Sequence, residues 1–491
     1  MPNVIAHPDR LFIGGEWVQP SSNAKFDVIM SSTEEVFISV AEAQKADVER
    51  AVASARQAFD HGAWRKSSPA ERGKYVRMLG ARIGERAEEV VQLWTSESGV
   101  TSTVGRLILQ IALKNYSQYA DIAETFTFEE RHAPQWGGTT GLLVREPVGV
   151  VGAIVPWNAP PTAIANKIAP ALVAGCTVVL KAPPQAAASA LLIAQIAEEI
   201  GLPKGVLNVI TADRAVSELL VRHPGVDKIS FTGSSQAGKT IASICGGRVA
   251  RCTLELGGKS AAIVLDDFDL DSFADQIGGA TPLLTGQICA AITRVVVSRR
   301  RHDRLVDAIA DRFRKVKVGD PFAADTGMGP LAMSQQRDRV ERYINIGKSE
   351  AKLATGGGRP KGLDRGYYIE PTLFGDVDNG CTIAREEIFG PVVSVIPVDS
   401  EDHALAAAND NPFGLNSSVF TNDIDRAYRF ARELRAGTVG HNGIFGDTTI
   451  AFGGFKESGI GREGGVEGLL PYLETKTIIM NGTPSHLKRG A

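Results

Sequence analysis

The feature that most restricts the fold of this chain is a regular alternation of short apolar runs and amphipathic stretches between Gly149 and Gly238. The apolar runs have the length of buried strands, and the stretches between them repeat apolar residues at helical spacing. The strands are predicted in GVVGAIV, TVVLKA, VLNVI and DKISFTG, and the helices over residues 161–174, 186–199 and 216–223. Because strand and helix alternate, the sequence predicts a parallel sheet that is covered by helices.

A second unit with the same alternation follows Leu256-Gly257-Gly258. Its strands are predicted in SAAIVLD, VVVS, YYIEPTLF and VVSVIPV, and its helices over residues 271–278, 303–315 and 423–434. Residues 45–97, ahead of the first unit, repeat apolar positions at helical spacing and predict a helical region. The C-terminal segment LETKTIIMNG has the pattern of a strand that belongs to neither unit.

Length and composition limit the classes of protein that this chain can be. A chain of 491 residues exceeds a single hydrophobic core, so two or three domains are expected. Hydrophobic residues make up 43% and charged residues 22%, which is typical of packed globular proteins. The formal net charge of -3 gives no overall field that would attract nucleic acid or an anionic membrane.

The cysteines and the apolar stretches favour a cytoplasmic protein. The five cysteines are scattered without a C-x-x-C pair or a His-rich spacing, which indicates reduced thiols and no zinc site. The N-terminal segment lacks the basic and continuous apolar regions of a secretory signal. The longest apolar stretch, residues 168–180, is interrupted by Pro170 and Gly175 and is shorter than the roughly 20 residues that cross a bilayer. We therefore expect no membrane span.

Two residues stand out as candidates for chemistry. Cys289, in GQICAAITR, is a candidate nucleophile, although a single free cysteine is more often a buried packing residue. Glu255 lies between two leucines and directly before Gly257-Gly258, and such apolar surroundings raise the pKa of a carboxyl group toward that of a general base. The alternative for Glu255 is a structural ion pair with Lys259 or an arginine.

Two further motifs follow predicted strands. Asn158 lies between prolines in VPWNAP, where its amide could donate a hydrogen bond to an oxyanion or could simply form a turn. The segment FTGSSQAG, residues 231–238, follows DKIS and opens a helix, so its free backbone N–H groups could bind a phosphate. It is not the G-x-G-x-x-G fingerprint, and a tight strand-to-helix turn would explain the same pattern.

Taken in order, these motifs resemble the aldehyde dehydrogenase superfamily. The motifs that carry the resemblance are PWN, FTGS, LELGGKS, GQICAAITR, EEIFGPV at 386–392 and FGGFKESGIGRE at 452–463. Weaker similarities extend from FIGGEW at 12–17 to the terminal YLETKT, so the likeness covers nearly the whole chain.

The resemblance implies the oxidation of an aldehyde to a carboxylic acid with hydride transfer to NAD or NADP. By resemblance, Cys289 is the nucleophile, Glu255 is the general base, and Asn158 forms the oxyanion hole with the backbone N–H of Cys289. Lys167 matches a lysine near the active site, although a lysine on a helix surface is the alternative. The reaction passes through a thiohemiacetal and a thioester and requires no metal.

The resemblance also implies a cofactor site, in which NAD is slightly favoured over NADP. Its residues are Ile154, Trp157, Lys181, Gly233, Ser234, Gly238, Leu256, Glu387 and Phe389. The chain departs from the family at the adenosine end, because Pro184 and Gln185 stand where many members have a carboxylate. The segment TADRAVS replaces a glycine-rich stretch, with Ala212, Arg214 and Ser217 in place of the glycines, and Arg214 could pair with a 2′-phosphate.

The resemblance also predicts a substrate tunnel. The expected tunnel residues are Ala159, Thr162, Asn166, Leu283, Ile288, Ala290 and Phe445. Several of these are small, so we expect a roomy and mostly apolar tunnel for a medium or bulky aldehyde.

By resemblance, the fold class is α/β, with two doubly wound parallel-sheet domains, a Rossmann-like cofactor domain and a catalytic domain, plus a small β oligomerisation element. The expected boundaries are 1–125 and 145–256 for the cofactor domain, 257–465 for the catalytic domain, and 126–144 and 466–491 for the oligomerisation element. A homodimer or homotetramer is expected.

Two other functions are compatible with the motifs. A thiol esterase or acyl hydrolase could use Cys289 and Asn158 without redox chemistry, but it would have no use for Glu387 and Phe389. A catalytically silent binding protein is the second alternative, and only the altered TADRAVS segment favours it.

Overall fold

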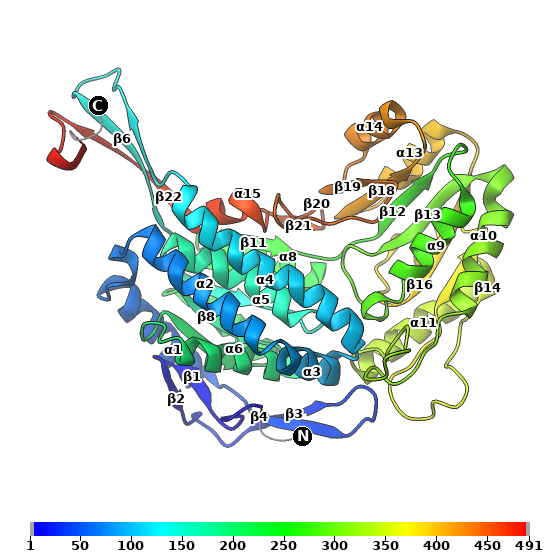
Figure 1. The fold of residues 1–491 in the computed structure, drawn as a ribbon, viewed down its shortest axis with the longest axis horizontal. Helices are drawn as coiled ribbons and strands as arrows, with labels where there is room; N and C mark the ends of the chain where they lie inside the picture. Colours follow the sequence, from blue (N-terminus) through cyan, green and yellow to red (C-terminus); the bar gives the residue numbers. More distant parts are fainter. Residues whose placement is uncertain (1–3, 488–491) are drawn as a thin grey trace.

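The computed structural model describes residues 4–487, and its chain forms two lobes, each built on a large sheet (Figure 1). The first lobe has an eight-stranded sheet in the order β2-β1-β9-β8-β7-β10-β11-β21. Its strands are β1 (Leu11–Ile13), β2 (Glu16–Val18), β7 (Val150–Ile154), β8 (Thr177–Ala182), β9 (Leu207–Thr211), β10 (Lys228–Thr232), β11 (Arg251–Glu255) and β21 (Gly459–Ile460). The five strands from β7 to β11 are parallel, as predicted.

Helices cover both faces of this sheet and bury a hydrophobic core on each side. One face carries α2 (Pro69–Glu85), α3 (Ala87–Ser98), α4 (Ser102–Thr125), α5 (Pro160–Ala174) and α6 (Ala187–Glu199). The other carries α1 (Lys45–Asp60), α7 (Arg214–Arg222) and α8 (Ser235–Gly247). The first domain is therefore doubly wound, as expected, although the sequence analysis did not identify α4.

The second lobe has a seven-stranded sheet in the order β14-β15-β16-β13-β12-β18-β19. Its strands are β12 (Ser260–Val264), β13 (Ile292–Ser298), β14 (Lys352–Thr355), β15 (Thr372–Gly375), β16 (Val392–Val398), β18 (Asn416–Phe420) and β19 (Thr438–His441). One face packs against α9 (Leu270–Ala280) and α10 (Arg299–Arg314), and the other against α11 (Ser334–Glu350), α13 (Glu401–Asn409) and α14 (Ile424–Glu433).

The edges of both sheets differ from the purely parallel pattern of the prediction. Strands β1 and β21 pair antiparallel with the first sheet, and β14 pairs antiparallel with β15 in the second. Helix α10 begins at Arg299, four residues before the predicted start at 303. The first turn of α10 is the polar run RRRH, which conceals its apolar spacing.

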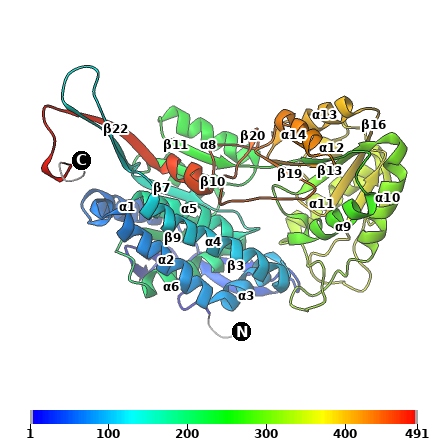
Figure 2. The same cartoon turned by 45° about the horizontal axis from the view of Figure 1, so that its top comes forward.

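A third sheet extends away from both lobes (Figure 2). It consists of β22 (Leu473–Met480), β6 (Thr140–Pro147) and β5 (Glu129–His132), paired antiparallel in that order. This confirms the prediction of a C-terminal strand outside both cores. The domain boundaries stay a prediction, and residues 1–3 and 488–491 lie outside the described residues.

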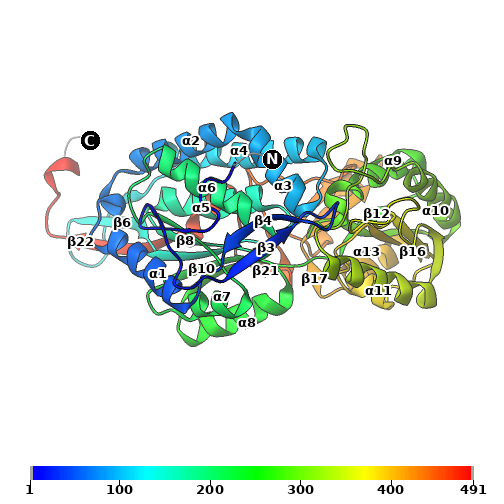
Figure 3. The ribbon, with the colours of Figure 1, turned by 90° about the horizontal axis from the view of Figure 1, so that it is seen from below.

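A hairpin of β3 (Lys25–Ile29) and β4 (Val36–Ala41) runs along the underside of the first lobe toward the second (Figure 3). Its tip contacts both lobes, because the Ser31 N–H donates to the Ser96 carbonyl (3.3 Å) and the Ser31 carbonyl accepts from the Tyr367 N–H (3.0 Å). The N-terminal hairpin therefore helps to fix the lobes relative to each other.

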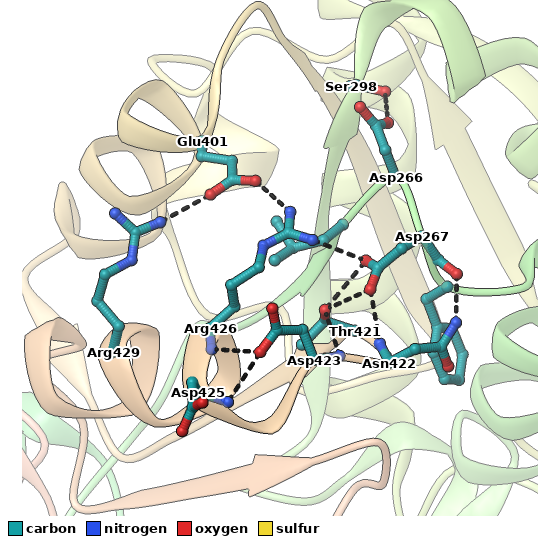
Figure 4. A network of polar contacts seen from close by, with 12 residues as sticks. Asp266, Asp267, Ser298, Glu401, Thr421, Asn422, Asp423, Asp425, Arg426 and Arg429 are labelled. Atoms are coloured by element: carbon teal, nitrogen blue, oxygen red, sulfur yellow. Dashed lines mark hydrogen bonds and ion pairs between the residues drawn. The ribbon is translucent and has the colours of Figure 1, made fainter.

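The two sheets present opposite ends to the space between the lobes. The PWN, FTGS and LELGG segments follow the carboxyl ends of β7, β10 and β11, whereas Cys289 precedes the amino end of β13. The carboxyl edge of the second sheet instead carries a polar network (Figure 4), beside a separate cavity of about 400 Å³. Asp267 there accepts hydrogen bonds from the Thr421 hydroxyl (2.7 Å) and the Asn422 N–H (2.8 Å), and Arg426 bridges Asp267 and Glu401.

No helix within residues 4–487 is long and apolar enough to span a bilayer.

Candidate active site

Two adjoining cavities lie at the carboxyl edge of the first sheet. The smaller, of about 230 Å³, is lined by Cys289, Asn158 and the segment around Glu387. The larger, of about 390 Å³, lies over the carboxyl ends of β7, β8 and β9. Both are lined by Pro156, Trp157, Thr232, Gly233 and Ser234, so they form one continuous groove.

The groove brings the predicted cofactor residues together. Trp157, Gly233 and Ser234 line both cavities, Leu256, Glu387 and Phe389 line the smaller one, and Ile154 and Lys181 line the larger one. Gly238 lies behind the wall, where a Cβ atom would come within 2.5 Å of the Leu256 side chain. A glycine is therefore required there by packing.

The loop that carries the predicted nucleophile is held in a strained conformation. Leu284 and Thr285 have left-handed backbone angles, with φ of 47° and 54°. The Thr285 hydroxyl donates to the Gly329 carbonyl (3.0 Å), and the Gln287 side chain both donates to the Leu284 carbonyl (3.0 Å) and accepts from the Ala332 N–H (3.0 Å). Such strain persists only where the surroundings fix the backbone, and it is common at functional sites.

Cys289 keeps some solvent exposure, but its sulfur is surrounded by protein. Burial raises the pKa of the Cys289 thiol to about 12, and the negative charges of Glu387 and Glu255 act in the same direction. The backbone N–H groups of Ala290 and Cys289 lower this pKa by a smaller amount. Without a cofactor the thiol is therefore protonated at neutral pH, and it needs a base to become a nucleophile.

Asn158 lies directly beside this loop. Its side-chain Nδ2 donates to the Gln287 carbonyl at 2.8 Å, and the Trp94 indole N–H donates to the Asn158 carbonyl at 2.9 Å. One N–H of the amide is thus held by the loop, and the second is left for another acceptor. Asn158 therefore does more than form a turn, because its side chain joins the first lobe to the loop that carries Cys289.

Glu255 is only 2% exposed, and its carboxylate oxygens have no hydrogen-bond partner among the described residues. The alternative ion pair with Lys259 is therefore absent. Burial raises the pKa of Glu255 well above its usual value, and the negative charge of Glu463 raises it further, whereas Lys167 and Arg462 lower it. An unpaired carboxyl group with a raised pKa can accept a proton near neutral pH.

Lys167 is fully buried, so the surface-lysine alternative is wrong. Its ammonium group donates to Glu463 (2.6 Å) and to the Thr232 hydroxyl (2.8 Å), and none of its hydrogen bonds among the described residues goes to Cys289 or Asn158. Sequence reasoning missed the role of Glu463 as its partner. Glu463 lies within FGGFKESGIGRE, but only the fold shows that this distant motif reaches α5.

Glu387 and Phe389 are held in the wall of the smaller cavity. The Gly258 N–H donates to the Glu387 carboxylate (3.0 Å), and burial raises the pKa of Glu387. Phe389 has a left-handed φ of 61° and packs edge-on against Trp157, with ring centroids 5.4 Å apart. Gln336 donates to the Phe389 carbonyl (2.6 Å), and this contact was not foreseen from the sequence.

The far end of the groove contains two cations without partners among the described residues. Burial lowers the pKa of Lys181 to about 8, and its ammonium group makes no hydrogen bond within the protein. Arg214 is exposed and lines the same cavity, beside Gln185 and Ser217. Ser234 caps α8 by accepting from the Ala237 N–H (3.3 Å), which leaves the positive end of that helix directed at the groove.

Two of the predicted tunnel residues, Ala159 and Ile288, belong to a small apolar cluster. Its buried members are Trp94, Val100 and Leu284, and its partly buried members are Val104, Ile108, Ala159 and Ile288. Thr162, Leu283 and Ala290 are partly exposed, Asn166 is nearly buried, and Phe445 is 59% exposed on the loop after β19. Val104 and Ile108 were missed because only the packing of α4 on α5 shows which face of α4 reaches the site.

The comparisons with known proteins agree with this geometry. The model of the "Aldehyde dehydrogenase family" matches residues 17–478. The chain belongs to the aldehyde dehydrogenase family. This aldehyde dehydrogenase is 42% identical to the geranial dehydrogenase of Castellaniella defragrans, over 96% of this chain and 99% of the relative. It is 41% identical to a 3-succinoylsemialdehyde-pyridine dehydrogenase of a Pseudomonas species, over 96% of this chain and 98% of the relative.

Solved structures show the same similarity. An aldehyde dehydrogenase of Mycobacterium tuberculosis complexed with NAD+ is 40% identical, with a TM-score of 0.94 over 97% of this chain and 99% of that chain. A mutant aldehyde dehydrogenase of Pseudomonas syringae complexed with NAD+ and octanal is 39% identical, with a TM-score of 0.94 over 98% of both chains.

This aldehyde dehydrogenase is accordingly an NAD(P)-dependent enzyme that oxidises an aldehyde to a carboxylic acid through a cysteine thiohemiacetal and a thioester. The alternative of a non-redox acyl hydrolase has no support. The groove fits a dinucleotide, since Lys181 and the N-terminus of α8 both face it. Glycines in its wall also let the backbone lie close to neighbouring residues. A Cβ atom at Gly257, for example, would lie 2.4 Å from the Glu387 carboxylate.

The close approach of Gly258 to the nucleophile loop gives a first prediction. In Gly258→Ala the new Cβ atom would lie 2.3 Å from the Cys289 carbonyl oxygen, so the loop must move. A displacement of about 1 Å at the reacting atoms lowers kcat by roughly 100-fold. The measurement is the rate of cofactor reduction with an aldehyde.

The matched control is Gly279→Ala in α9, where a Cβ atom meets nothing within 4 Å. This control is expected to keep the wild-type rate. A Gly258→Ala enzyme with wild-type kcat would show that the close approach is not needed.

The buried pair of Lys167 and Glu463 gives a second prediction. Lys167→Met leaves the Glu463 carboxylate buried without its cation, which destabilises the protein by about 3–5 kcal/mol. The double variant Lys167→Met/Glu463→Gln should recover most of this loss, because neither charge remains. Thermal denaturation midpoints of the wild type and of these two variants measure the effect.

The control is the exposed pair of Lys204 and Glu16, at the same distance of 2.6 Å. Lys204→Met is expected to leave the midpoint unchanged, because solvent screens this pair. Equal midpoints for the single and double variants of the buried pair would contradict the prediction.

Proposed function

We propose that Cys289 is the nucleophile of this aldehyde oxidation, that Glu255 is its general base, and that Asn158 stabilises the oxyanion. One observation carries this proposal. Cys289 and Asn158 line the same cavity of about 230 Å³ as Glu387, and the charge of Glu255 reaches the thiol. A nucleophile and a hydrogen-bond donor thus line one cavity beside a groove that fits a dinucleotide, and the unpaired Glu255 carboxyl group acts electrostatically on the thiol.

The reaction begins with the transfer of the thiol proton from Cys289 to Glu255. The thiolate adds to the aldehyde carbon, and the oxyanion accepts hydrogen bonds from the free N–H of the Asn158 amide and from the Cys289 backbone N–H. Bound in the groove, NAD(P)+ supplies the two-electron acceptor that takes the hydride of the former aldehyde carbon. Cys289 then carries a thioester.

Hydrolysis completes the cycle at the same site. Glu255 first releases the thiol proton to solvent. It then removes a proton from water, whose oxygen adds to the thioester carbon, and the C–S bond breaks to release the carboxylic acid and the thiolate, which regains a proton from Glu255. One aldehyde, one water and one NAD(P)+ give one acid, one NAD(P)H and one proton. Because Glu255 must be ionised to act, its raised pKa makes deacylation slower as the pH falls toward and below that pKa.

The third prediction tests these roles. Cys289→Ala should abolish cofactor reduction, and Glu255→Gln, which lacks the base for both steps, should reduce at most one cofactor per site, more slowly than the wild type, and then turn over little. Any residual deacylation by Glu255→Gln should no longer become slower as the pH falls. Stopped-flow absorbance of the reduced nicotinamide and mass spectrometry of the trapped acyl-enzyme are the measurements.

Cys381→Ala is the matched control, because this cysteine lies in the second lobe and its thiol donates only to the Glu350 carbonyl. It should behave as the wild type. Turnover by Cys289→Ala would contradict the assigned nucleophile.

For the substrate, we propose a medium-sized or bulky and largely apolar aldehyde. The apolar cluster beside Cys289 and the small side chain of Ala159 support this choice. The names of similar proteins point the same way, since one relative acts on geranial and one solved structure contains octanal. A marked preference for acetaldehyde over longer aldehydes would contradict it.

The fourth prediction concerns the cofactor. We propose that Arg214 allows this enzyme to accept NADP as well as NAD, because its unpaired guanidinium lines the adenosine end of the groove. Gln185, which lines the same end, stands where many family members have a carboxylate. A charge-assisted hydrogen bond contributes about 1.5–3 kcal/mol. Arg214→Ala should therefore lower kcat/KM for NADP by roughly 10- to 100-fold and leave that for NAD nearly unchanged.

The control is Arg222→Ala on the same helix, whose guanidinium is already paired with Glu218 at 2.8 Å. It should change neither value. High selectivity of the wild type for NAD would remove the role of Arg214.

We also propose a cytoplasmic homodimer or homotetramer. The five cysteines are free, which supports a reducing location. Strand β22 lies at an open edge of the third sheet, and an exposed edge strand is a natural pairing surface for a second copy. A monomeric mass by analytical ultracentrifugation would contradict the oligomer.

A further inference from the structure

Two cysteines outside the active site lie in contact where α8 meets β11. Cys245 is in the last turn of α8, and Cys252 is the second residue of β11. Cys245 is 1% exposed, whereas Cys252 is partly exposed and packs against the hydrophobic cluster that contains Cys245. A hydrogen bond joins the two thiols.

The backbone turn between the two cysteines fixes this contact. The Cys245 carbonyl accepts hydrogen bonds from the N–H groups of Ala250 (2.9 Å) and Arg248 (3.2 Å), so the chain folds back from the helix onto the strand. The Arg248 guanidinium fastens the turn to the rest of the lobe by donating to the carbonyls of Val221 (2.7 Å) and Val226. Sulfur atoms that already touch can form a bond with little movement of the backbone.

The strand directs Cys252 toward α8. Successive side chains of a strand point to opposite faces of a sheet. Leu254 packs into the cluster that α8 covers, so Cys252, two residues earlier, points the same way. On the opposite face, the fully buried Lys228 donates to the Thr253 hydroxyl (2.7 Å). The Cys252 sulfur therefore meets the helix, with a buried ammonium group behind the strand.

These neighbours make Cys252 the more acidic of the two thiols. The hydrogen bond from the Cys245 thiol lowers the pKa of Cys252 to about 7, and the charge of Lys228 acts in the same direction, against the effect of burial. The same hydrogen bond raises the pKa of Cys245. The pKa of the Cys289 thiol is raised to about 12. Because the thiolate is the reactive form, Cys252 is more reactive toward an oxidant than Cys289 in the enzyme without cofactor.

We propose that Cys245 and Cys252 form a redox modification site, at which hydrogen peroxide converts the two thiols into a reversible disulfide. The Cys252 thiolate attacks one peroxide oxygen, the O–O bond breaks, and hydroxide leaves a sulfenic acid on the sulfur. The Cys245 sulfur then attacks the Cys252 sulfur, the S–O bond breaks, and the departing hydroxide takes the Cys245 proton to become water. In total, two thiols are oxidised and one peroxide is reduced to two water molecules.

The disulfide would tie a wall of the cofactor groove to the first sheet. Ile241 and Ile244, on the same helix as Cys245, line the larger cavity. The bond closes a loop of eight residues, from Cys245 to Cys252, and restricts the unfolded chain. We therefore expect oxidation to raise the thermal midpoint by roughly 2–5 °C. Neither cysteine lines the cavity of Cys289, so the oxidised enzyme should still oxidise aldehydes.

Tryptic peptides separate the relevant cysteines for the test. Peptides 240–248, 252–259 and 260–294 carry Cys245, Cys252 and Cys289, respectively. The full-length enzyme without cofactor is treated with an equimolar amount of hydrogen peroxide, alkylated at intervals and digested. Peptides 240–248 and 252–259 should become joined at least about 10-fold faster than peptide 260–294 is oxidised. Dithiothreitol should separate them and reverse the rise of the thermal midpoint.

Variants identify the role of each thiol. Cys252→Ser should form no disulfide and leave Cys245 free for alkylation. Cys245→Ser should stop at the sulfenic acid of Cys252, which dimedone traps on peptide 252–259, because the new hydroxyl can still donate to the Cys252 sulfur. Cys381→Ala is the matched control and should form the disulfide at the wild-type rate, since Cys381 lies in the second lobe.

Two results with the wild type would overturn the proposal, whether or not the variants fold. One is the oxidation of peptide 260–294 before any joined peptide appears. The other is a bond between two copies of peptide 252–259, which would place the disulfide between subunits. Loss of aldehyde oxidation in the untreated wild type would instead contradict the proposed function.

Discussion

The site depends on the close contact of three backbone segments between the lobes. Gly258 follows the last parallel strand of the first sheet, and its N–H donates to the carboxylate of Glu387. A side chain at Gly258 would collide with the carbonyl of Cys289, and one at Gly286 would lie 2.3 Å from the backbone of Gly390. The three loops can meet at this distance only because glycines occupy the contacts.

This closure also determines the electrostatics. It removes water from the thiol of Cys289 and from the carboxyl groups of Glu255 and Glu387, so the pKa of each is raised. A neutral thiol can transfer its proton internally to the Glu255 carboxylate, because the raised pKa of Glu255 makes that ionised group a better proton acceptor. The buried pair of Lys167 and Glu463 lies next to this arrangement and adjusts the pKa of Glu255 with charges of both signs.

Much of this could be predicted from local patterns. The alternation of strands and helices predicted both parallel sheets, because apolar runs in sequence must be buried on both faces of a sheet. The predicted residues Cys289, Asn158 and Glu387 do line one cavity. The misses have physical reasons as well. The arginines at the start of α10 conceal its apolar spacing, and Glu463 lies 296 residues from Lys167, beyond the reach of any local pattern.

The sequence by itself determined the order of the elements and the chemical groups available, since helical spacing, strand length and glycine positions are local properties. Only the tertiary structure decided which groups meet, because burial and distance arise when separate segments pack. Glu255 is an unpaired carboxyl group rather than a partner of Lys259, because its oxygens have no hydrogen-bond partner among residues 4–487. Cys245 and Cys252 meet because the turn between them folds β11 back onto α8.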